Sequence, residues 1–495
     1  MTSPAATAPP RPTAGRLRGR GRGHARATAL LAGALLGLAA NGCGPARPPS
    51  GPPPNAASVV AAITEAGLRG RLEKLAAVTA GSAGFRAVGT AGYDAAADMV
   101  TAELRAAGWD VSGDAYTGAA FFDEGGSSLE VGDRLFGSAD LRPLIFAPGG
   151  TVEGRVVAVD WDPDAADRTG KGCAVTHYGD LPPQAIVVVR SGPCLRRDQV
   201  LAAQRAGAAA FVAVYPNAPP GVVYRPTLID PASLTIPAVA VSRAAADALL
   251  AAVADRATAR LVTHARTTAV PTRSILAELP GSDPGAVVML GAHLDSVIDG
   301  PGINDDGSGV AALLEIARAL RGTRPRATIR LAFWSGEELG LHGSVRYASS
   351  LSADDRRAIL VYLNADMVAS PNGFAGVYDE TAAPAGSDAV HALLAAAVER
   401  AGGTPVEVDI GGGSDHYGFA QAGVATGGVF SGASEPVTAD QAATAGAIAG
   451  RPADACYHQS CDDVANANLP LARLLTAALA DVTVRLADNP ELLRP

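Results

Sequence analysis

The stretch GAHLDSVIDGPGINDDGSG, residues 291–309, places one histidine and four aspartates within fourteen positions. Carboxylates held close together repel each other, so burying them costs energy unless a positive charge lies between them. Side chains of the same kinds follow other apolar segments: Glu337 and Glu338 after LAFWSG, Asp366 after ILVYLNA, and His458 within CYHQSC. Two histidines with several carboxylates and no thiolate are typical of a site for zinc or a harder divalent metal.

The number of carboxylates favours two metal ions over one. Asp305, Glu337, Glu338 and Asp366 are too many ligands for a single zinc but suit a metal pair, which needs a shared carboxylate and a shared water. Asp305 is the expected bridge, because the glycines around it let the backbone approach the metals closely. In SGEELG, whose glycines favour a tight turn, one glutamate could bind metal while the other takes a proton from the shared water.

Asp295 is expected to support this site without binding metal. It lies two residues after His293, and positions i and i+2 of an extended chain point to the same side. Its carboxylate could accept the second ring N–H of His293, which would fix the tautomer and raise the basicity of the histidine. Asp306, beside the expected bridge, is predicted to cap the following helix.

The surrounding segments predict an α/β fold. Residues 58–79 and 91–107 have helical spacing of apolar residues, and a strand starts at WDVSGDAYTG. After residue 270, strands such as VVMLGAH, TIRLAFWS and ILVYLNADM alternate with helices such as GVAALLEIARAL. This alternation predicts a mixed, mostly parallel sheet flanked by helices. Ligand sites in such sheets lie beyond the carboxyl ends of the strands, so we expect the candidate ligands to meet at one edge.

A stretch of different character interrupts this pattern at residues 139–267. It contains short Val-rich strands, among them VEGRVVAVDW, AIVVVRSG, AAFVAVYP and IPAVAVS, with one helix in DQVLAAQRAGA. No cluster of His, Asp and Glu with metal spacing occurs in it. We therefore expect an inserted β-rich domain.

The N-terminus has the plan of an export signal, predicted for residues 1–42. Six arginines precede the apolar run ATALLAGALLGLAA, which is too short to span a membrane. The run ends in ANGC, which resembles a lipoprotein cleavage box and predicts a lipid on Cys43; ordinary cleavage nearby is the alternative. Residues 43–57 form a Pro-rich tether. The protein is therefore expected to be exported, either as a cell-surface lipoprotein or as a secreted protein.

The cysteines agree with export, and the net charge bears on the possible partners. Of five cysteines, Cys173 with Cys194 and Cys456 with Cys461 are the natural pairs for disulfides in an oxidising compartment, which leaves Cys43 unpaired. Buried free thiols are the alternative. The net charge of −9 argues against nucleic acid as a partner, because nucleic-acid binding needs basic patches. The only membrane association expected is through the lipid on Cys43, and the sequence makes no prediction of oligomeric state.

The motifs AHLDS, GINDDGSG, SGEELGLHGS, LNADMV and CYHQSCD resemble those of the secreted di-zinc aminopeptidases of metallopeptidase family 28. The resemblance implies a zinc-dependent exopeptidase domain over residues 58–138 and 268–495. Residues 139–267 are similar to a protease-associated domain, most clearly in SGPCLRRDQVLAAQRAGAAAFVAVY.

The resemblance also implies two zinc ions and a role for each site residue. His293 and Asp366 would bind one zinc, Glu338 and His458 the other, and Asp305 would bridge them. Glu337 would be the general base, and Tyr457 would stabilise the oxyanion.

The implied activity is removal of the N-terminal residue from peptides with a free N-terminus, through a metal-bridging hydroxide and the glutamate base. A carboxypeptidase or aminoacylase on the same scaffold is the alternative among hydrolases. It is disfavoured because relatives often carry an arginine where this chain has Gly413. A non-catalytic binding relative is the alternative from another class.

Overall fold

The computed structural model describes residues 51–159, 172–192, 194–215, 218, 221–379 and 383–493. The predicted signal segment, Cys43 and the first part of the predicted tether lie outside these residues. Strands within this part of the chain form two separate eight-stranded sheets. None of the helices in the described ranges is both long and apolar enough to cross a bilayer.

The first sheet contains the strands that carry the candidate ligands. Its central strands β12, β11, β13 and β16 run parallel. Strands β1 and β10 pair antiparallel with their neighbours, and β14 pairs antiparallel with β16 but parallel with β15. The predicted mixed, mostly parallel sheet is thus confirmed. In spatial order the strands are β1 (Asp110–Asp123), β10 (Ala265–Leu279), β12 (Ala327–Trp334), β11 (Asp283–His293), β13 (Ile359–Ala365), β16 (Thr426–Phe430), β14 (Gly376–Tyr378) and β15 (Val406–Val408).

Helices pack on both faces of the first sheet, as expected for a sheet whose central strands are continuous apolar runs. The larger apolar core lies between the sheet and α2, α3, α6, α9 and α12, and a smaller aromatic core around Trp334, Tyr362 and Phe419 lies under α7 and α10. The helices are α1 (Ala56–Ala62), α2 (Glu65–Ala80), α3 (Ala91–Ala106), α6 (Gly307–Ala319), α7 (His342–Ser350), α8 (Ala353–Ala358), α9 (Ser387–Arg400), α10 (His416–Gln421), α11 (Ala439–Ala445) and α12 (Leu469–Asp488), with 3-10 turns η2 (Val464–Asn466) and η3 (Pro490–Leu492).

One predicted helix is two helices. The spacing over residues 58–79 predicts a single helix, but α1 ends at Ala62 and α2 begins at Glu65. The break lies at Thr64, whose side chain accepts a hydrogen bond from the Gly67 backbone N–H and so starts a new helix.

The second sheet has a parallel centre, β5-β6-β7-β8, with antiparallel strands at its edges. A disulfide joins Cys173 to Cys194, as predicted. The strands in spatial order are β3 (Arg134–Phe136), β2 (Ser128–Val131), β9 (Thr258–Thr263), β5 (Gly150–Val159), β6 (Ile186–Arg190), β7 (Ala210–Val214), β8 (Ala238–Val241) and β4 (Leu141–Pro143); the helices are η1 (Val175–His177), α4 (Arg196–Arg205) and α5 (Arg243–Ala254).

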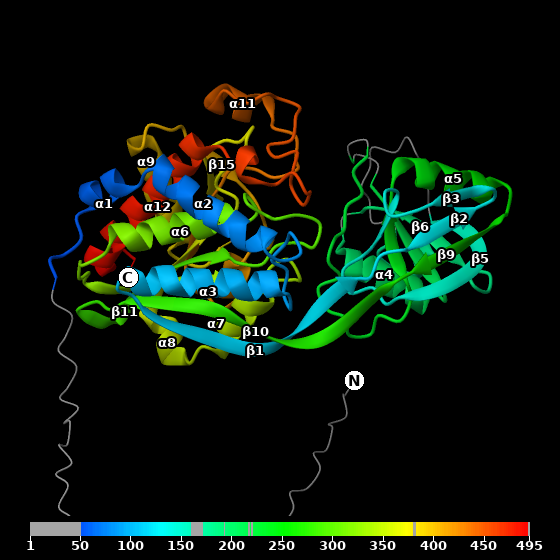
Figure 1. Ribbon diagram of the computed structural model, residues 1–495, viewed down its shortest axis with the longest axis horizontal. Coiled ribbons are helices and arrows are strands. Elements are labelled where there is room, and N and C mark those ends of the chain that lie inside the picture. The colour runs from blue at the N-terminus through cyan, green and yellow to red at the C-terminus, as the bar shows by residue number, and fades with distance from the viewer. Residues whose placement is uncertain are drawn as a thin grey trace, which may run out of the picture. The chain divides into compact units, whose positions relative to one another are not determined.

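Strands β1 and β10 connect the two sheets. They pair antiparallel over the whole 14-residue length of β1, from Asp110 opposite Glu278 to Asp123 opposite Ala265 (Figure 1). The chain therefore leaves the first sheet along one strand and returns along the strand beside it.

Candidate metal centre

The candidate ligands meet at the carboxyl-end edge of the first sheet. His293 is the last residue of β11, the Glu337–Glu338 pair follows β12, and Asp366 follows β13. These three strands are parallel neighbours, so their ends lie at the same edge. Asp305 comes from the loop before α6, and His458 comes from a loop between α11 and α12.

Two groups of side chains are close enough to hold a metal ion each: His293 with Asp305 and Asp366, and Asp305 with Glu338 and His458. One Asp305 oxygen lies 3.0 Å from the Nε2 of His293, and the other lies 3.0 Å from the Nε2 of His458. Glu338 Oε2 lies 3.1 Å from the same His458 nitrogen, and Asp366 Oδ1 lies 3.6 Å from His293 Nε2. Asp305 is therefore shared between the two groups.

The cluster is buried and carries an excess of negative charge. Burial would raise the pKa of Asp305, but His293 and His458 donate hydrogen bonds to its carboxylate and hold the pKa well below its usual range. Burial raises the pKa of Glu337 well above its ordinary value, and the neighbouring Asp366 and Glu338 add to this rise although His293 opposes it. Within the described residues, the buried Oε1 of Glu338 has no hydrogen-bond partner. A buried, unpaired carboxylate oxygen among imidazole and carboxylate donors fits divalent cations such as zinc.

The turn after β12 brings both glutamates to the site. Gly336 has a φ of +79°, which suits glycine and lets the chain turn sharply after Ser335. Glu337 Oε2 then lies 4.0 Å from His293 Nε2, whereas Glu338 reaches the other group at His458.

Comparisons with known proteins agree with these motifs. A family model described as Peptidase family M28 matches residues 274–483, and a PA domain model matches residues 152–249. The chain is 32% identical over 432 residues to an aminopeptidase of Pseudomonas aeruginosa (strain PAO1 among others), covering 83% of this chain and 79% of that protein. It is 36% identical over 408 residues to the probable lipoprotein aminopeptidase LpqL of Mycobacterium tuberculosis (strain H37Rv), covering 79% and 78%.

The chain belongs to peptidase family M28.

The fold agrees with solved structures. The aminopeptidase from Aneurinibacillus sp. strain AM-1 superposes with a TM-score of 0.70 at 20% identity, over 88% of this chain and 96% of that one. BSAP, a zinc aminopeptidase from Bacillus subtilis, superposes with a TM-score of 0.66 at 19% identity, over 87% and 96%. The predicted family, its fold and the presence of an inserted protease-associated domain are thus confirmed. The second sheet begins before the predicted start at residue 139, because β2 and β3 pair at its edge beside β9.

Asp295 supports this M28 centre differently from the prediction. The Nδ1 atom of His293 lies 3.0 Å from the backbone carbonyl oxygen of Asp295, whereas the nearest carboxylate oxygen of Asp295 is 4.0 Å away. The predicted carboxylate–imidazole hydrogen bond is therefore wrong. Asp295 lies two residues beyond the end of β11, and its carboxylate is engaged by other donors.

The Asp295 carboxylate instead holds the glutamate turn. Its Oδ1 accepts the backbone N–H groups of Gly336 at 2.8 Å and Glu337 at 3.2 Å. Asp306 has a similar bracing role. It caps α6 by accepting from Gly309, as predicted, and it also accepts the backbone N–H of His293 at 3.1 Å.

A disulfide closes the loop that carries His458. Cys456 and Cys461 are bonded, as predicted, and are five residues apart. The ring of Tyr457 stacks on His458 with 3.8 Å between ring centroids. Burial, together with the nearby carboxylates of Asp305 and Glu338, raises the pKa of the Tyr457 phenol well above its ordinary value, so the phenol keeps its proton.

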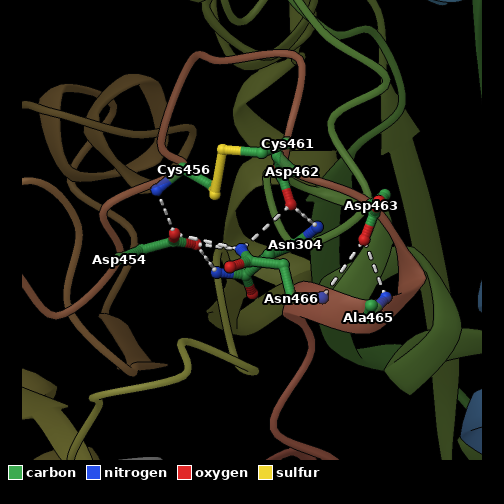
Figure 2. Close-up of a disulfide and its surroundings, with 8 residues drawn as sticks. All are labelled: Asn304, Asp454, Cys456, Cys461, Asp462, Asp463, Ala465 and Asn466. Carbon is green, nitrogen blue, oxygen red and sulfur yellow. Dashed lines mark hydrogen bonds between the residues drawn. A yellow bond between two sulfur atoms is a disulfide. The ribbon is translucent and has the colours of Figure 1, made fainter.

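The same loop positions Asp305 through a carboxylate that sequence reasoning missed. Asp462, directly after Cys461, is 1% exposed, and one of its oxygens accepts the backbone N–H of Asn304 at 2.8 Å (Figure 2). Its other oxygen accepts the backbone N–H of Asp305 at 3.0 Å. The sequence CDDV, residues 461–464, contains two adjacent aspartates, and no local pattern indicates which of them is buried.

A second buried aspartate fixes the other side of this network. Asp454 accepts hydrogen bonds from the backbone N–H of Cys456 and from the side-chain amides of Asn304 and Asn466 (Figure 2). The disulfide loop and the loop before α6 are therefore held together by carboxylate–amide hydrogen bonds.

Arg86 is a buried cation that sequence reasoning also missed. It is fully buried, and its guanidinium donates to the backbone carbonyl oxygens of Leu294, Pro301 and Asp305, at 2.7 Å for Leu294 and 3.3 Å for Asp305. Burial lowers the pKa of Arg86, and the carboxylates of Asp462 and Asp305 oppose that effect. Arg86 thus supplies fixed positive charge behind the site and fastens the loop that leads to Asp305.

Proposed function

We propose that this M28 chain is a zinc-dependent aminopeptidase that removes the N-terminal residue from peptides. This chain aligns with about four fifths of the length of two relatives that are named as aminopeptidases, which supports an aminopeptidase activity. The observation that carries the proposal is the buried Asp305, whose two oxygens each lie 3.0 Å from a different histidine. A carboxylate with one histidine on each side suits a pair of metal ions.

The proposed ligand sets follow the two groups. His293 and Asp366 would hold one zinc ion, Glu338 and His458 would hold the second, and Asp305 would contact both. When bound, zinc supplies Lewis acidity, which polarises the scissile carbonyl and lowers the pKa of a water molecule.

Glu337 is the proposed general base. Its carboxylate lies beside His293, and the turn that carries it is held by the Asp295 carboxylate. Burial and the neighbouring acids raise its pKa, which strengthens Glu337 as a base, so that it could accept a proton from water and release it to the leaving amine. The Tyr457 phenol, which keeps its proton, would donate a hydrogen bond to the developing oxyanion.

The charge of the site favours an aminopeptidase over a carboxypeptidase. The ammonium group of a peptide N-terminus would meet the carboxylates of Glu337 and Asp366. A carboxypeptidase would need a free cation for the substrate carboxylate. The buried cation beside this site, Arg86, already donates to three carbonyl oxygens.

We further propose that the protein is exported and carries a lipid on Cys43. Two disulfides within the described residues are typical of exported proteins. A relative named as a probable lipoprotein aminopeptidase supports lipidation. Metabolic labelling with a clickable fatty acid should label the wild-type protein and fail to label Cys43→Ser.

Leucine p-nitroanilide hydrolysis tests the catalytic proposal. Wild-type protein should release nitroaniline, lose this activity to a chelator and regain it with zinc. Glu337→Gln should lower kcat by about 10²–10⁴-fold while the bound zinc stays at two per chain, whereas the exposed-site control Glu399→Gln should match wild type. Absence of chelator-sensitive turnover across a panel of aminoacyl nitroanilides would refute the proposal and favour a binding relative.

A further inference from the structure

One segment of the inserted domain, residues 223–230, contacts both loops that carry candidate metal ligands. The Thr227 hydroxyl donates to the backbone carbonyl of Leu339 at 3.0 Å, directly after Glu338. The His342 Nε2 lies 2.8 Å from the backbone carbonyl of Ile229. Arg225 reaches the other loop, residues 294–306, which leads to Asp305. One segment of the inserted domain therefore contacts both of the loops that follow the neighbouring strands β11 and β12.

The contact of Arg225 is built as a buried ionic anchor. Its guanidinium is bidentate on Asp299, with Nε 2.9 Å from Oδ2 and Nη2 3.3 Å from Oδ1. The same guanidinium lies 2.8 Å from an oxygen of Asp123, and Arg142 lies 2.6 Å from Asp299 Oδ1. Arg225 is 8% exposed. Bidentate arginine–carboxylate pairs fix orientation as well as distance, and burial protects them from screening.

The loop that Arg225 anchors has no helix or strand of its own. Residues 294–306 run in turns between β11 and α6. Arg86 fastens one side of this loop through the carbonyl oxygens of Leu294, Pro301 and Asp305. Arg225 fastens Asp299, which lies between the points held by Arg86. Without Arg225, the middle of the loop would lose its buried, bidentate ion pair at Asp299, six residues before Asp305.

The contact between the inserted segment and the glutamate turn, at Ile229 and Gly340, is also close. Ile229 has a φ of +69°, a left-handed conformation that is costly for a β-branched residue. It lies against Gly340, where an added Cβ would be 3.0 Å from the Ile229 Cα. A side chain at position 340 would therefore require the Ile229 backbone to shift, so the inserted domain fits closely against the glutamate turn.

We propose that the inserted domain is a working part of the metal centre, with Arg225 as the positioning residue that holds residues 294–306, and through them Asp305, in place. The effect on zinc binding rests on the proposed function. The effect on the loop does not, because it follows from the hydrogen bonds and ion pair of Arg225 with Asp299.

Hydrogen–deuterium exchange on zinc-free protein tests the positioning itself. Arg225→Ala should speed amide exchange within residues 294–306, and Arg225→Lys should give an intermediate rate, because lysine keeps the charge but not the bidentate geometry. Zinc affinity, measured by competition with a chelator, should fall by about 10–100-fold in Arg225→Ala. The control is Arg134→Ala, which removes an exposed arginine on the edge strand β3 whose guanidinium lies over Phe136.

Folded Arg225→Ala protein with wild-type exchange in residues 294–306 and wild-type zinc affinity would overturn the proposal. If Arg225→Ala is not recovered folded, Asp299→Asn decides in the same way, because it removes the charge of the anchor with little change of shape. Faster loop exchange in a protein whose wild type binds no zinc would refute the proposed function and leave the positioning role standing.

Discussion

The two adjacent aspartates of the disulfide loop allow a sharp test of how Asp305 is held. In Asp462→Asn, one of the two side-chain oxygens becomes an NH2 group. Whichever way the amide is turned, either the Asn304 or the Asp305 backbone N–H then faces a donor in place of its acceptor. Because Asp462 is 1% exposed, water cannot readily replace that acceptor.

The structure sets the size of the effect. Leaving one buried N–H without an acceptor costs about 1–3 kcal/mol. In the zinc-free protein the loop can relax, whereas bound zinc would fix Asp305, so most of this cost should appear as lost metal affinity. An energy of about 1–3 kcal/mol corresponds to an affinity loss of about 5- to 150-fold.

Asp463→Asn is the matched control. Asp463 is exposed, and it accepts the backbone N–H groups of Ala465 and Asn466 through Oδ1 alone, so asparagine can keep both hydrogen bonds (Figure 2). Zinc affinity of each variant is measured by chelator competition, with circular dichroism to verify the fold. Wild-type affinity in folded Asp462→Asn, or an equal loss in Asp463→Asn, would refute the reasoning.

Three further outcomes are expected. Arg86→Met should lower the free energy of unfolding in urea by at least about 3 kcal/mol, because each lost hydrogen bond from a charged group is worth roughly 1.5–3 kcal/mol; a loss below about 1 kcal/mol would contradict the role given to Arg86. Replacing Cys456 and Cys461 together by serine should lower the free energy of unfolding by about 2 kcal/mol, since the closed loop is short. The same double variant should bind zinc more weakly. Unchanged zinc affinity would show that the disulfide does not position the loop that carries His458. Burial would raise the pKa of Asp481, but its ion pairs, including that with Arg485, lower it below 3.8. The contribution of Asp481 to stability is thus present above pH 3.8 and lost as the pH falls further. The difference in unfolding free energy between wild type and Asp481→Asn should therefore shrink below pH 3.8. A difference that stays constant over this pH range would show that the ion pairs contribute nothing to stability.

The sheet and its edge could be predicted because the signal is local. His293, the glutamate pair and Asp366 each follow a continuous apolar run, and such runs at short spacing are typical of buried parallel strands. Once the strands are parallel neighbours, the meeting of their carboxyl ends follows from geometry. The disulfide partners could be predicted for a similar reason, because two pairs lie close in the sequence.

The supporting residues could not be predicted, because their roles depend on burial. Arg86 and Asp462 have the same chemistry as many exposed arginines and aspartates of this chain, and only tertiary packing distinguishes them. The partner of Asp295 was missed because the rule for extended chains was applied to a residue two positions beyond the end of β11. The break at Thr64 was missed because apolar spacing continues across it, although a threonine before a helical segment is a typical capping signal.

The ladder of β1 and β10 bears on how such a chain could have acquired its second sheet. Asp123 and Ala265 are cross-strand partners at the end of that ladder, so a two-residue hairpin turn could join them directly. Everything between them could then enter or leave the gene as a single cassette without shifting the register of the remaining strands. A descendant that lost the cassette would keep the ladder, but Asp299 would lose its ion-pair partners Arg142 and Arg225. Such a descendant should therefore carry either a different cation near position 299 or an uncharged residue in place of the aspartate.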